Sequence, residues 1–270
     1  MKYIIDHDYH IHSHRSLCSD DPLQTTQYIL DYAEKNGLLD ICLTDHFWDE
    51  RIPGAENFDF YKEQNFEHLK QALPLPESKS VKFYFGCEAE MDKHMRLGIS
   101  KERFEQFDFV IIPTTHLHMP SFTIDEADDS LERRAFLYAE RLHKLLDMDL
   151  PFDKIGIAHL TCGLIANKQP ADHIRVLELI SDATFMTLFE KLADRKAGFE
   201  LNFPIFRYDG EAIDQILRPY RIAKKCGCKF YLGSDAHHPG GLDTAITQFA
   251  AIIDALDLTE SDKFTPFPRG

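Results

Sequence analysis

The 270-residue sequence lacks the features that mark several classes of protein. No apolar run approaches the roughly 18 residues of a membrane-spanning helix. The opening MKYIIDHDYHIHSH becomes charged too early for a secretion signal, so we expect neither a membrane partner nor export. The six cysteines form no C-x-x-C pair and lie mostly in apolar stretches, as free buried thiols of a cytoplasmic protein do. Basic residues are few: 30 Lys and Arg face 45 Asp and Glu, and the net charge of −15 argues against nucleic acid held by bulk charge.

Several common catalytic motifs are also missing. There is no G-x-S-x-G elbow, no G-x-x-x-x-G-K-[ST] loop and no H-E-x-x-H pair. No glycine-rich turn follows the first predicted strand, so a dinucleotide-binding fold is unsupported. The acidity does not exclude an anionic small molecule, because bound cations can reverse the local potential. What the sequence does contain in excess is histidine, with 14 residues.

Short apolar runs alternate with helix-like stretches along the chain. The runs are rich in Ile, Val, Phe and Tyr, which is typical of strands packed on both faces, and the stretches between them carry helical spacing. The predicted strands are 3–12, 39–46, 81–88, 108–115, 154–159, 198–202 and 229–234, and the predicted helices are 24–35, 126–146, 184–196, 210–225 and 242–256. The intervals 47–80, 117–130 and 160–183 are interpreted as elaborated loops, the first and last with room for a short helix.

Seven strand–helix units in this order predict an α/β fold of parallel strands joined by right-handed helical crossovers. No linker and no change of composition marks a boundary. We therefore expect residues 1–270 to form a single barrel domain with a short Pro-containing tail after about residue 258.

Imidazole and carboxylate groups fall at the C-terminal ends of the predicted strands. In a closed barrel these ends converge on the face where active sites are built, so groups from both halves of the chain would meet. His10 and His12 share one side of their strand with Asp8, which is placed to accept an N–H from a ligand imidazole. Such ligands suit Zn, Fe or Mn. The strand-end groups are His10, His12, His46, Glu88, His116, His159, Asp235 and His237.

Taken singly, these residues have simpler interpretations. A strand-end histidine such as His46 or His159 is more often a hydrogen-bonded structural residue, Glu88 could face water, and Asp45 could cap a helix. However, six of the seven predicted strand ends carry an imidazole or a carboxylate. This joint pattern favours a multinuclear metal site. Other histidines are assigned to the surface (His68, His94, His143, His173) or left undecided (His7, His14).

The string Asp8 to Ser13 (DYHIHS), followed by Ser19-Asp20-Asp21, resembles the opening motif of the PHP (polymerase and histidinol phosphatase) family. Further segments resemble the family's later motifs in the same order, and the layout is most similar to its stand-alone phosphatases, including the histidinol-phosphatase branch. These segments are Thr44-Asp45-His46, Gly86-Cys87-Glu88, Ile157-Ala158-His159 and Gly233 to Pro239 (GSDAHHP).

The resemblance implies a distorted (β/α)7 TIM-like barrel that hydrolyses a small-molecule phosphomonoester by attack of a metal-bridging hydroxide. It implies three divalent ions, Zn, Fe or Mn, one held by His10, His12, Glu88 and Asp235, one by Glu88, His116 and His159, and one by Asp20, His46 and His237. It also implies substrate binding by Asn202 and Arg207. The remaining assignments are substrate binding by His238 and catalytic roles for Glu88, Asp235 and His237, with the leaving oxygen protonated by Asp235, His237 or His238.

Three departures from the family pattern leave points open. Asp20 stands where many members have His. His116-Leu117-His118 carries one residue more than expected before the histidine, so either imidazole can be the ligand, and His116 is favoured. Leu160 to Leu164 lacks the polar and basic residues expected of histidinol phosphatases, so histidinol phosphate is one candidate substrate among several.

Two other functions compete with this interpretation. An amidohydrolase-like barrel also uses an early His-x-His and a late Asp, but it usually needs a bridging carboxylated lysine, a role that Glu88 fills here. A non-catalytic, metal-loaded anion-binding module would have lost ligands, and nearly all of them are present.

Overall fold

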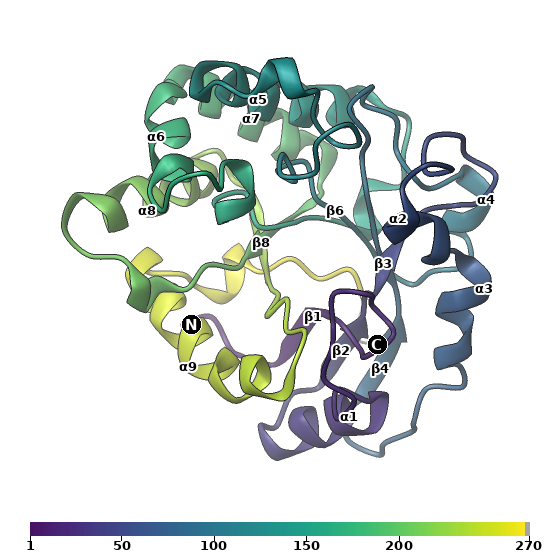
Figure 1. The fold of residues 1–270 in the computed structure, drawn as a ribbon. Coiled ribbons are helices and arrows are strands. Elements are labelled where there is room, and N and C mark those ends of the chain that lie inside the picture. Colours follow the sequence, from purple (N-terminus) through teal and green to yellow (C-terminus); the bar gives the residue numbers. More distant parts are fainter. Residues whose placement is uncertain (268–270) are drawn as a thin grey trace.

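The computed structural model describes residues 1–267. The strands are β1 (His7–Ile11), β2 (Asp40–Leu43), β3 (His46–Phe47), β4 (Lys82–Phe85), β5 (Cys87–Ala89), β6 (Val110–Ile112), β7 (Ile155–Ile157), β8 (Gly198–Leu201) and β9 (Lys229–Leu232). They pair in parallel in the order β1-β2-β4 and β3-β5-β6-β7-β8-β9. Figure 1 shows these strands at the centre of the molecule with the helices arranged around them.

The two groups of strands are parts of one barrel. β2 leads after two residues into β3, and β4 leads after Gly86 into β5. The nine strands therefore occupy seven strand positions around the barrel, which we call staves. Gly86 is required at its break, because a Cβ there would lie 2.5 Å from the Phe109 carbonyl oxygen. The barrel closes between β1 and the segment after β9, where the Asp235 amide donates to the His10 carbonyl at 2.7 Å. The predicted distorted (β/α)7 barrel is confirmed.

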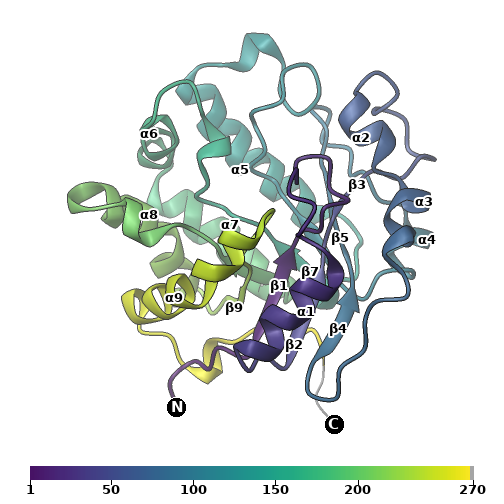
Figure 2. The same cartoon turned by 60° about the horizontal axis from the view of Figure 1, so that its bottom comes forward.

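The longer helices cover the outside of the barrel, with α1 in front of β1 and β2 in Figure 2. Two of them begin three or more residues away from the predicted start, because their caps decide the first residue. The Ser130 hydroxyl accepts from the Arg133 amide and starts α5 after residue 126, and the His238 imidazole accepts from the Gly241 amide and starts α9 before residue 242. The longer helices are α1 (Thr26–Lys35), α5 (Leu131–Asp147), α6 (Asp172–Leu179), α7 (Asp182–Arg195), α8 (Gly210–Lys225) and α9 (Pro239–Leu256).

The predicted loops contain short helical elements. α2 (Asp59–Glu63) and α3 (Phe66–Leu69) lie within 47–80, α6 lies within 160–183, and α4 (Lys101–Phe104) precedes β6. Single 3₁₀ turns occupy Lys70–Ala72, Glu126–Asp128, Phe152–Lys154, Gly163–Ile165, Ile205–Arg207 and Glu260–Asp262. Within residues 1–267, no helix combines the length and the apolar character needed to cross a membrane.

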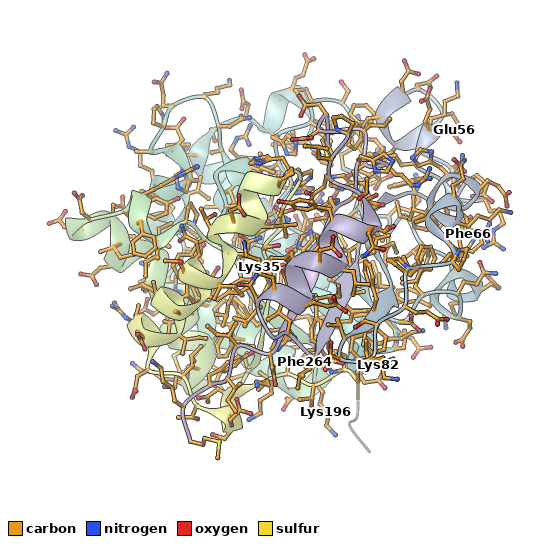
Figure 3. All side chains as sticks on the ribbon, turned by 90° about the horizontal axis from the view of Figure 1, so that it is seen from below. Lys35, Glu56, Phe66, Lys82, Lys196 and Phe264 are labelled. Atoms are coloured by element: carbon orange, nitrogen blue, oxygen red, sulfur yellow. The ribbon has the colours of Figure 1, made fainter. Side chains whose placement is uncertain are left out.

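Aromatic side chains fill the lower half of the barrel interior. Tyr9, Phe109 and Tyr231 come from different staves and meet there, with ring centroids 5.4 to 6.3 Å apart. The predicted tail also packs against this end. Its described part, 259–267, places Phe264 against Phe109 and Tyr231, and Figure 3 shows Phe264 toward the same end of the molecule as Lys82, at the start of β4. Residues 268–270 of the predicted tail lie outside the described part.

Candidate functional site

The strand ends bring most of the predicted ligand residues together at the upper rim of the barrel. Histidines and acidic residues form three overlapping groups. Within each group, the ligand atoms all lie within 4.8 Å of one another. Every member except Asp235 and His237 is buried. The groups are His10–His12–Asp235, His10–Glu88–His159 and His12–His46–His237.

The first group has the spacing of ligands around a single cation. His10 Nε2 and His12 Nε2 lie 3.0 Å apart and 3.3 and 3.2 Å from Asp235 Oδ1. Behind them, His10 Nδ1 donates to Glu200 at 2.6 Å, and His12 Nδ1 donates to Ser16 Oγ at 2.9 Å, because that hydroxyl's own proton goes to a carboxylate. Both Nε2 lone pairs therefore face one point. Metal–ligand bonds of about 2.0–2.2 Å put neighbouring ligand atoms about 3 Å apart, so these residues fit a divalent ion.

Glu88 lies between the groups. Its Oε1 is 3.0 Å from His159 Nε2, and its Oε2 is 2.7 Å from His46 Nδ1. Glu88 Oε2 and His46 Nδ1 are both buried. Neither has a hydrogen-bond partner, because the geometry between them does not suit a hydrogen bond. Buried polar atoms without partners are costly. A cation bound by both atoms would remove that cost.

The electrostatics keep the central carboxylates ionised. Burial opposes the charge on Glu88, but the imidazoles of His46 and His10 outweigh it and hold the pKa of Glu88 well below its usual value. Burial likewise opposes the charge on Asp235, and His10 and His12 hold the pKa of Asp235 well below its usual value. Both side chains are therefore available as anionic ligands.

Two of these residues have strained backbones. His159 has a φ of 30° and Asp235 has a φ of 53°. Both values lie in the left-handed region, which residues other than glycine rarely adopt. Such strain occurs at functional sites, where the surrounding structure holds it in place.

Two buried glutamates missed by the sequence interpretation support the ligands. Glu200, at the end of β8, accepts from His10 Nδ1 through Oε1 and from the His159 amide through Oε2, both at 2.6 Å. Glu90 accepts from His116 Nδ1 at 2.6 Å and from a tyrosine hydroxyl. Both lie at strand ends, so the rule that selected Glu88 could have found them.

The role expected for Asp8 is wrong. Its carboxylate accepts from the Ser234 amide at 2.9 Å and from the Tyr32 hydroxyl at 3.2 Å, and so joins β1 to the end of β9 and to α1. The imidazole of His10 is bonded to Glu200 instead, and the pairing of β1 with β2 is irregular between Asp8 and Ile11.

Several other residues lie outside the three groups or have surroundings that differ from those predicted for them. The His116 ring stacks on His159 with centroids 4.8 Å apart, but within residues 1–267 neither His116 nor His118 belongs to the three groups. Asp45 does not cap a helix and accepts hydrogen bonds from Ser13 and Ser16. Two predicted surface histidines are not fully solvated: His173 is buried, and His68 is bonded to the Arg15 carbonyl.

The turn after β1 does not bring Asp20 to the site. Asp20 is exposed and belongs to none of the three groups within the described residues. Cys18, which is also exposed and outside the three groups, lines a cavity together with His46 and His237. Burial raises the pKa of the Cys18 thiol, but hydrogen bonds to His237 and His46 outweigh it and lower this pKa to about 7.

Comparisons with known proteins agree with this arrangement. Residues 8–202 match the PHP domain family. The chain belongs to that family. Its fold is shared with a histidinol phosphate phosphatase from Lactococcus lactis, solved with Zn, L-histidinol and phosphate, at 18% identity and a TM-score of 0.58 over 96% of this chain and 98% of that one. A probable 2-pyrone-4,6-dicarboxylic acid hydrolase from Acinetobacter baumannii, solved with citric acid, aligns at 14% identity and a TM-score of 0.44 over 96% and 97%. No curated protein matches the sequence.

Two cavities lie beside Asp235, on one side of the ligand groups of this PHP domain. Their volumes are about 350 and 590 Å³, and both are lined by Asn202, Arg207 and Asp235. His238 lines the smaller one. The buried Nδ2 of Asn202 has no hydrogen-bond partner, so it is an unused donor. The predicted substrate-binding residues thus lie together at one edge of the metal-ligand groups.

A third cavity of about 340 Å³ opens on the other side of the groups. Its outer wall is largely apolar, and its inner wall includes His46, Glu88 and His237. The outer wall contains Phe58, Phe60, Tyr61, Met119 and Leu164. Family membership and the grouped ligands together support a hydrolase of the metal-dependent phosphoesterase class.

Proposed function

We propose that this PHP domain hydrolyses a small-molecule phosphomonoester with the help of three divalent cations. The single observation that carries the proposal is the central position of Glu88, whose two oxygens approach ligand residues of different groups. A carboxylate in that position suits a ligand shared between neighbouring ions. The predicted family, fold and ligand types all agree with this use.

The three groups suggest how the ions would be distributed. The first ion would lie among His10, His12 and Asp235, and the second between Glu88 and His159, with His116 stacked beside them. The third would lie between His46 and His237. When bound, divalent ions of this kind lower the pKa of water to give a nucleophile and neutralise phosphoryl oxygens.

The chain's own residues would then bind and orient the ester. The Arg207 guanidinium suits bidentate recognition of phosphate, and the unpartnered Asn202 amide would donate beside it. His238 Nδ1 accepts from the Gly241 amide, so the Nε2–H of its neutral ring would donate a hydrogen bond to the phosphate in the cavity that His238 shares with Arg207.

The apolar cavity supports a class of leaving group. Phe58, Phe60 and Met119 offer the alcohol aromatic and thioether contacts rather than hydrogen bonds. Such a wall suits an aromatic or aliphatic alcohol better than a sugar. The hydroxyl groups of a sugar would lose their hydrogen bonds to water there and find no protein partner to replace them. Histidinol phosphate stays in the set because its imidazole can stack on these rings.

The test combines metal analysis with a phosphate-release assay. Purified protein is loaded in turn with Zn, Fe(II) or Mn and assayed with aryl phosphates, histidinol phosphate, sugar phosphates, nucleotides and short oligonucleotides. We expect metal-dependent release, fastest with an aromatic or aliphatic ester. The substitutions His10→Ala, Glu88→Ala and Asp235→Ala should each lower both metal content and turnover, whereas His143→Ala, on an exposed helical face, should lower neither.

Two results would contradict the proposal. The first is full metal content and full turnover in the three site variants. The second is hydrolysis of amides or lactones with no phosphate release, which would favour the amidohydrolase-like alternative. Tight anion binding without turnover in fully metal-loaded protein would favour the binding-module alternative.

A further inference from the structure

The loop after β6 holds His118 at the wall of the apolar cavity. On one side of His118, the Leu117 amide donates to the Leu164 carbonyl at 3.2 Å. On the other side, the Met119 amide donates to the Thr123 hydroxyl at 3.3 Å, and the Thr123 amide donates to the Met119 carbonyl at 2.9 Å. The backbone on both sides of His118 is thus tied to neighbouring segments. The position of the His118 ring in the cavity wall is therefore set by the fold.

The His118 imidazole is not used by any other part of the chain. It lines the apolar cavity, and within residues 1–267 it belongs to none of the three ligand groups and forms no hydrogen bond or ion pair. Its ring stands at 89° to that of His116, with centroids 5.2 Å apart. The Nδ1 atom of His118 is closed off from solvent and has no partner. The edge of the ring that can meet a ligand is therefore the edge that carries Nε2.

This open edge offers a hydrogen-bond donor. A buried N–H group without an acceptor is rarer in proteins than a buried acceptor without a donor. The neutral His118 ring therefore keeps its single proton on Nε2 and leaves a lone pair on the closed Nδ1. A protonated ring would carry a proton on Nε2 as well. In both states, His118 presents Nε2–H to the cavity.

The other polar side chains of this cavity are already engaged. The Tyr61 hydroxyl donates to Glu90 at 3.0 Å, and His116 Nδ1 donates to the same carboxylate at 2.6 Å. Cys18 contributes only a thiol, which is a weak donor. The remaining polar members belong to the ligand groups, namely His46, Glu88, Asp235 and His237. His118 is thus the one strong donor of the wall that is free to bind an organic group.

We propose that His118 is a specificity-determining residue that donates a hydrogen bond from Nε2 to an acceptor atom on the alcohol of the substrate. The alcohol would be aromatic or aliphatic and carry one acceptor, such as a ring nitrogen or a carbonyl oxygen. A single donor satisfies one acceptor, so the several hydroxyls of a sugar would still lack partners. This inference rests on the phosphoester hydrolysis proposed above and narrows its substrate class.

Two matched kinds of ester test the role of His118. Benzyl phosphate is compared with pyridylmethyl phosphates, which have the same shape and carry the ring nitrogen at each of the possible positions. We expect the wild type to prefer one pyridylmethyl ester, and His118→Phe to lower that preference in kcat/KM about 3- to 10-fold, as the loss of one hydrogen bond does. The change should appear in KM, because the bond lies away from the phosphorus. His118→Gln, whose amide can donate, should keep part of the preference.

The ratio of the two esters in wild type and variant cancels their difference in intrinsic reactivity. His143→Phe, on an exposed helical face, is the control and should leave the ratio unchanged. Metal content should be equal in His118→Phe and wild type, because His118 is assigned to the alcohol and not to a cation. Equal ester ratios in His118→Phe and wild type, or the loss of a metal ion from His118→Phe, would overturn the proposal.

Binding of non-hydrolysable analogues separates this inference from the proposed function. Benzylphosphonate and the pyridylmethylphosphonates are titrated into metal-loaded protein, and the same loss of preference is expected in the Kd values of His118→Phe. Protein that shows this preference in binding but releases no phosphate from any ester would contradict the proposed hydrolysis and leave the role of His118 supported. Equal Kd ratios in the two proteins would contradict the role of His118 whether or not the esters are hydrolysed.

Discussion

Glu200 holds two candidate ligand residues at once. One oxygen accepts from the His10 ring and the other from the His159 backbone, and Gly233 leaves the space that this carboxylate needs, since a Cβ there would collide with Glu200. A carboxylate hydrogen-bonded to a ligand imidazole fixes the ring's tautomer and orientation. The precision of the metal site thus depends on a residue that need not touch a metal.

Glu200→Gln should weaken metal binding while the chain stays folded. The amide can accept from only one of the two N–H groups, and its NH₂ would face the other donor. We expect metal affinity to fall about 10- to 100-fold, as measured by competition with a chelator. Glu178→Gln, on an exposed face of α6, is the matched control and should bind metal as the wild type does. Unchanged affinity in Glu200→Gln would show that the carboxylate does not position the ligands.

The sequence predicted most residues of the site but not all of them. Strand-end placement selected the members of the three groups, because parallel strands in a barrel must end at one rim. The same placement applies to Glu200, which was overlooked. The exposed position of Asp20 could not be predicted in this way, because Asp20 follows a turn whose course is set by hydrogen bonds from Leu17 to Gln64 and from Ser19 to the His237 carbonyl.

The loop from β3 to α2 leads into part of the apolar wall, namely Phe58, Phe60 and Tyr61, and Asp49 anchors this loop. The Asp49 carboxylate accepts two hydrogen bonds from the Arg51 guanidinium, at 3.0 and 2.8 Å, and one from the Ser100 hydroxyl at 2.5 Å. The Asp49 amide donates to the Gly98 carbonyl at 2.8 Å. Burial opposes the negative charge of the Asp49 carboxylate. The hydrogen bonds to the carboxylate outweigh the effect of burial and lower the pKa of Asp49 to about 2.

Asp49→Asn should therefore destabilise the protein in a pH-dependent way. A carboxyl group whose pKa is lower in the folded than in the unfolded chain stabilises the fold above its unfolded pKa of about 4, and this stabilisation is lost as the pH falls toward about 2. We expect Asp49→Asn to lower the free energy of unfolding by about 2 kcal/mol at neutral pH. In urea titrations the difference from wild type should narrow below pH of about 4.

The control for this loop is Asp149→Asn, which removes an exposed ion pair with Lys101. An exposed pair contributes little, so this variant should unfold like the wild type. A difference between Asp49→Asn and wild type that stays constant down to the lowest pH measured would contradict the account of Asp49.

At the scale of elements, periodicity located α1, α5, α7, α8 and α9 and all seven strand positions of the barrel, but it located neither α6 nor the breaks within two of the strand positions. The staves break at 44–45 and at Gly86, where contacts to neighbouring strands require a bend. Those contacts are long-range, and no local pattern announces them. The helix starts moved for a similar reason, since Ser130 and His238 act as caps only in the folded geometry.

At the scale of the whole molecule, the barrel has one end for chemistry and one for stability. The rim at the C-terminal ends of the strands carries the ligand groups, and the opposite end is closed by aromatic rings and the segment 259–267. Figure 3 shows the separation, with Phe264 and Lys82 near one end and Glu56 near the other. The alternation of strands and helices predicted the barrel, but nothing local predicted that the final segment would return beneath it.

Phe264→Ala should destabilise the barrel without altering the site. The side chain is 7% exposed and packs against Phe109 and Tyr231, so its loss should cost about 3–5 kcal/mol. Urea denaturation measures this cost, and metal content at saturation should stay at the wild-type value. Phe136→Ala, whose ring is 52% exposed, should change stability far less. Equal stability of Phe264→Ala and wild type would show that the final segment does not close the barrel.

Anomalous X-ray scattering from crystals of the metal-loaded protein tests the central claim most directly. The account predicts that residues from both ends of the sequence hold cations at one rim of the barrel. Data collected at the absorption edge of the bound metal should show peaks within bonding distance of Glu88 and of Asp235, with His10 and His159 among the ligands. Metal-saturated crystals with no anomalous peak among these residues would contradict the account.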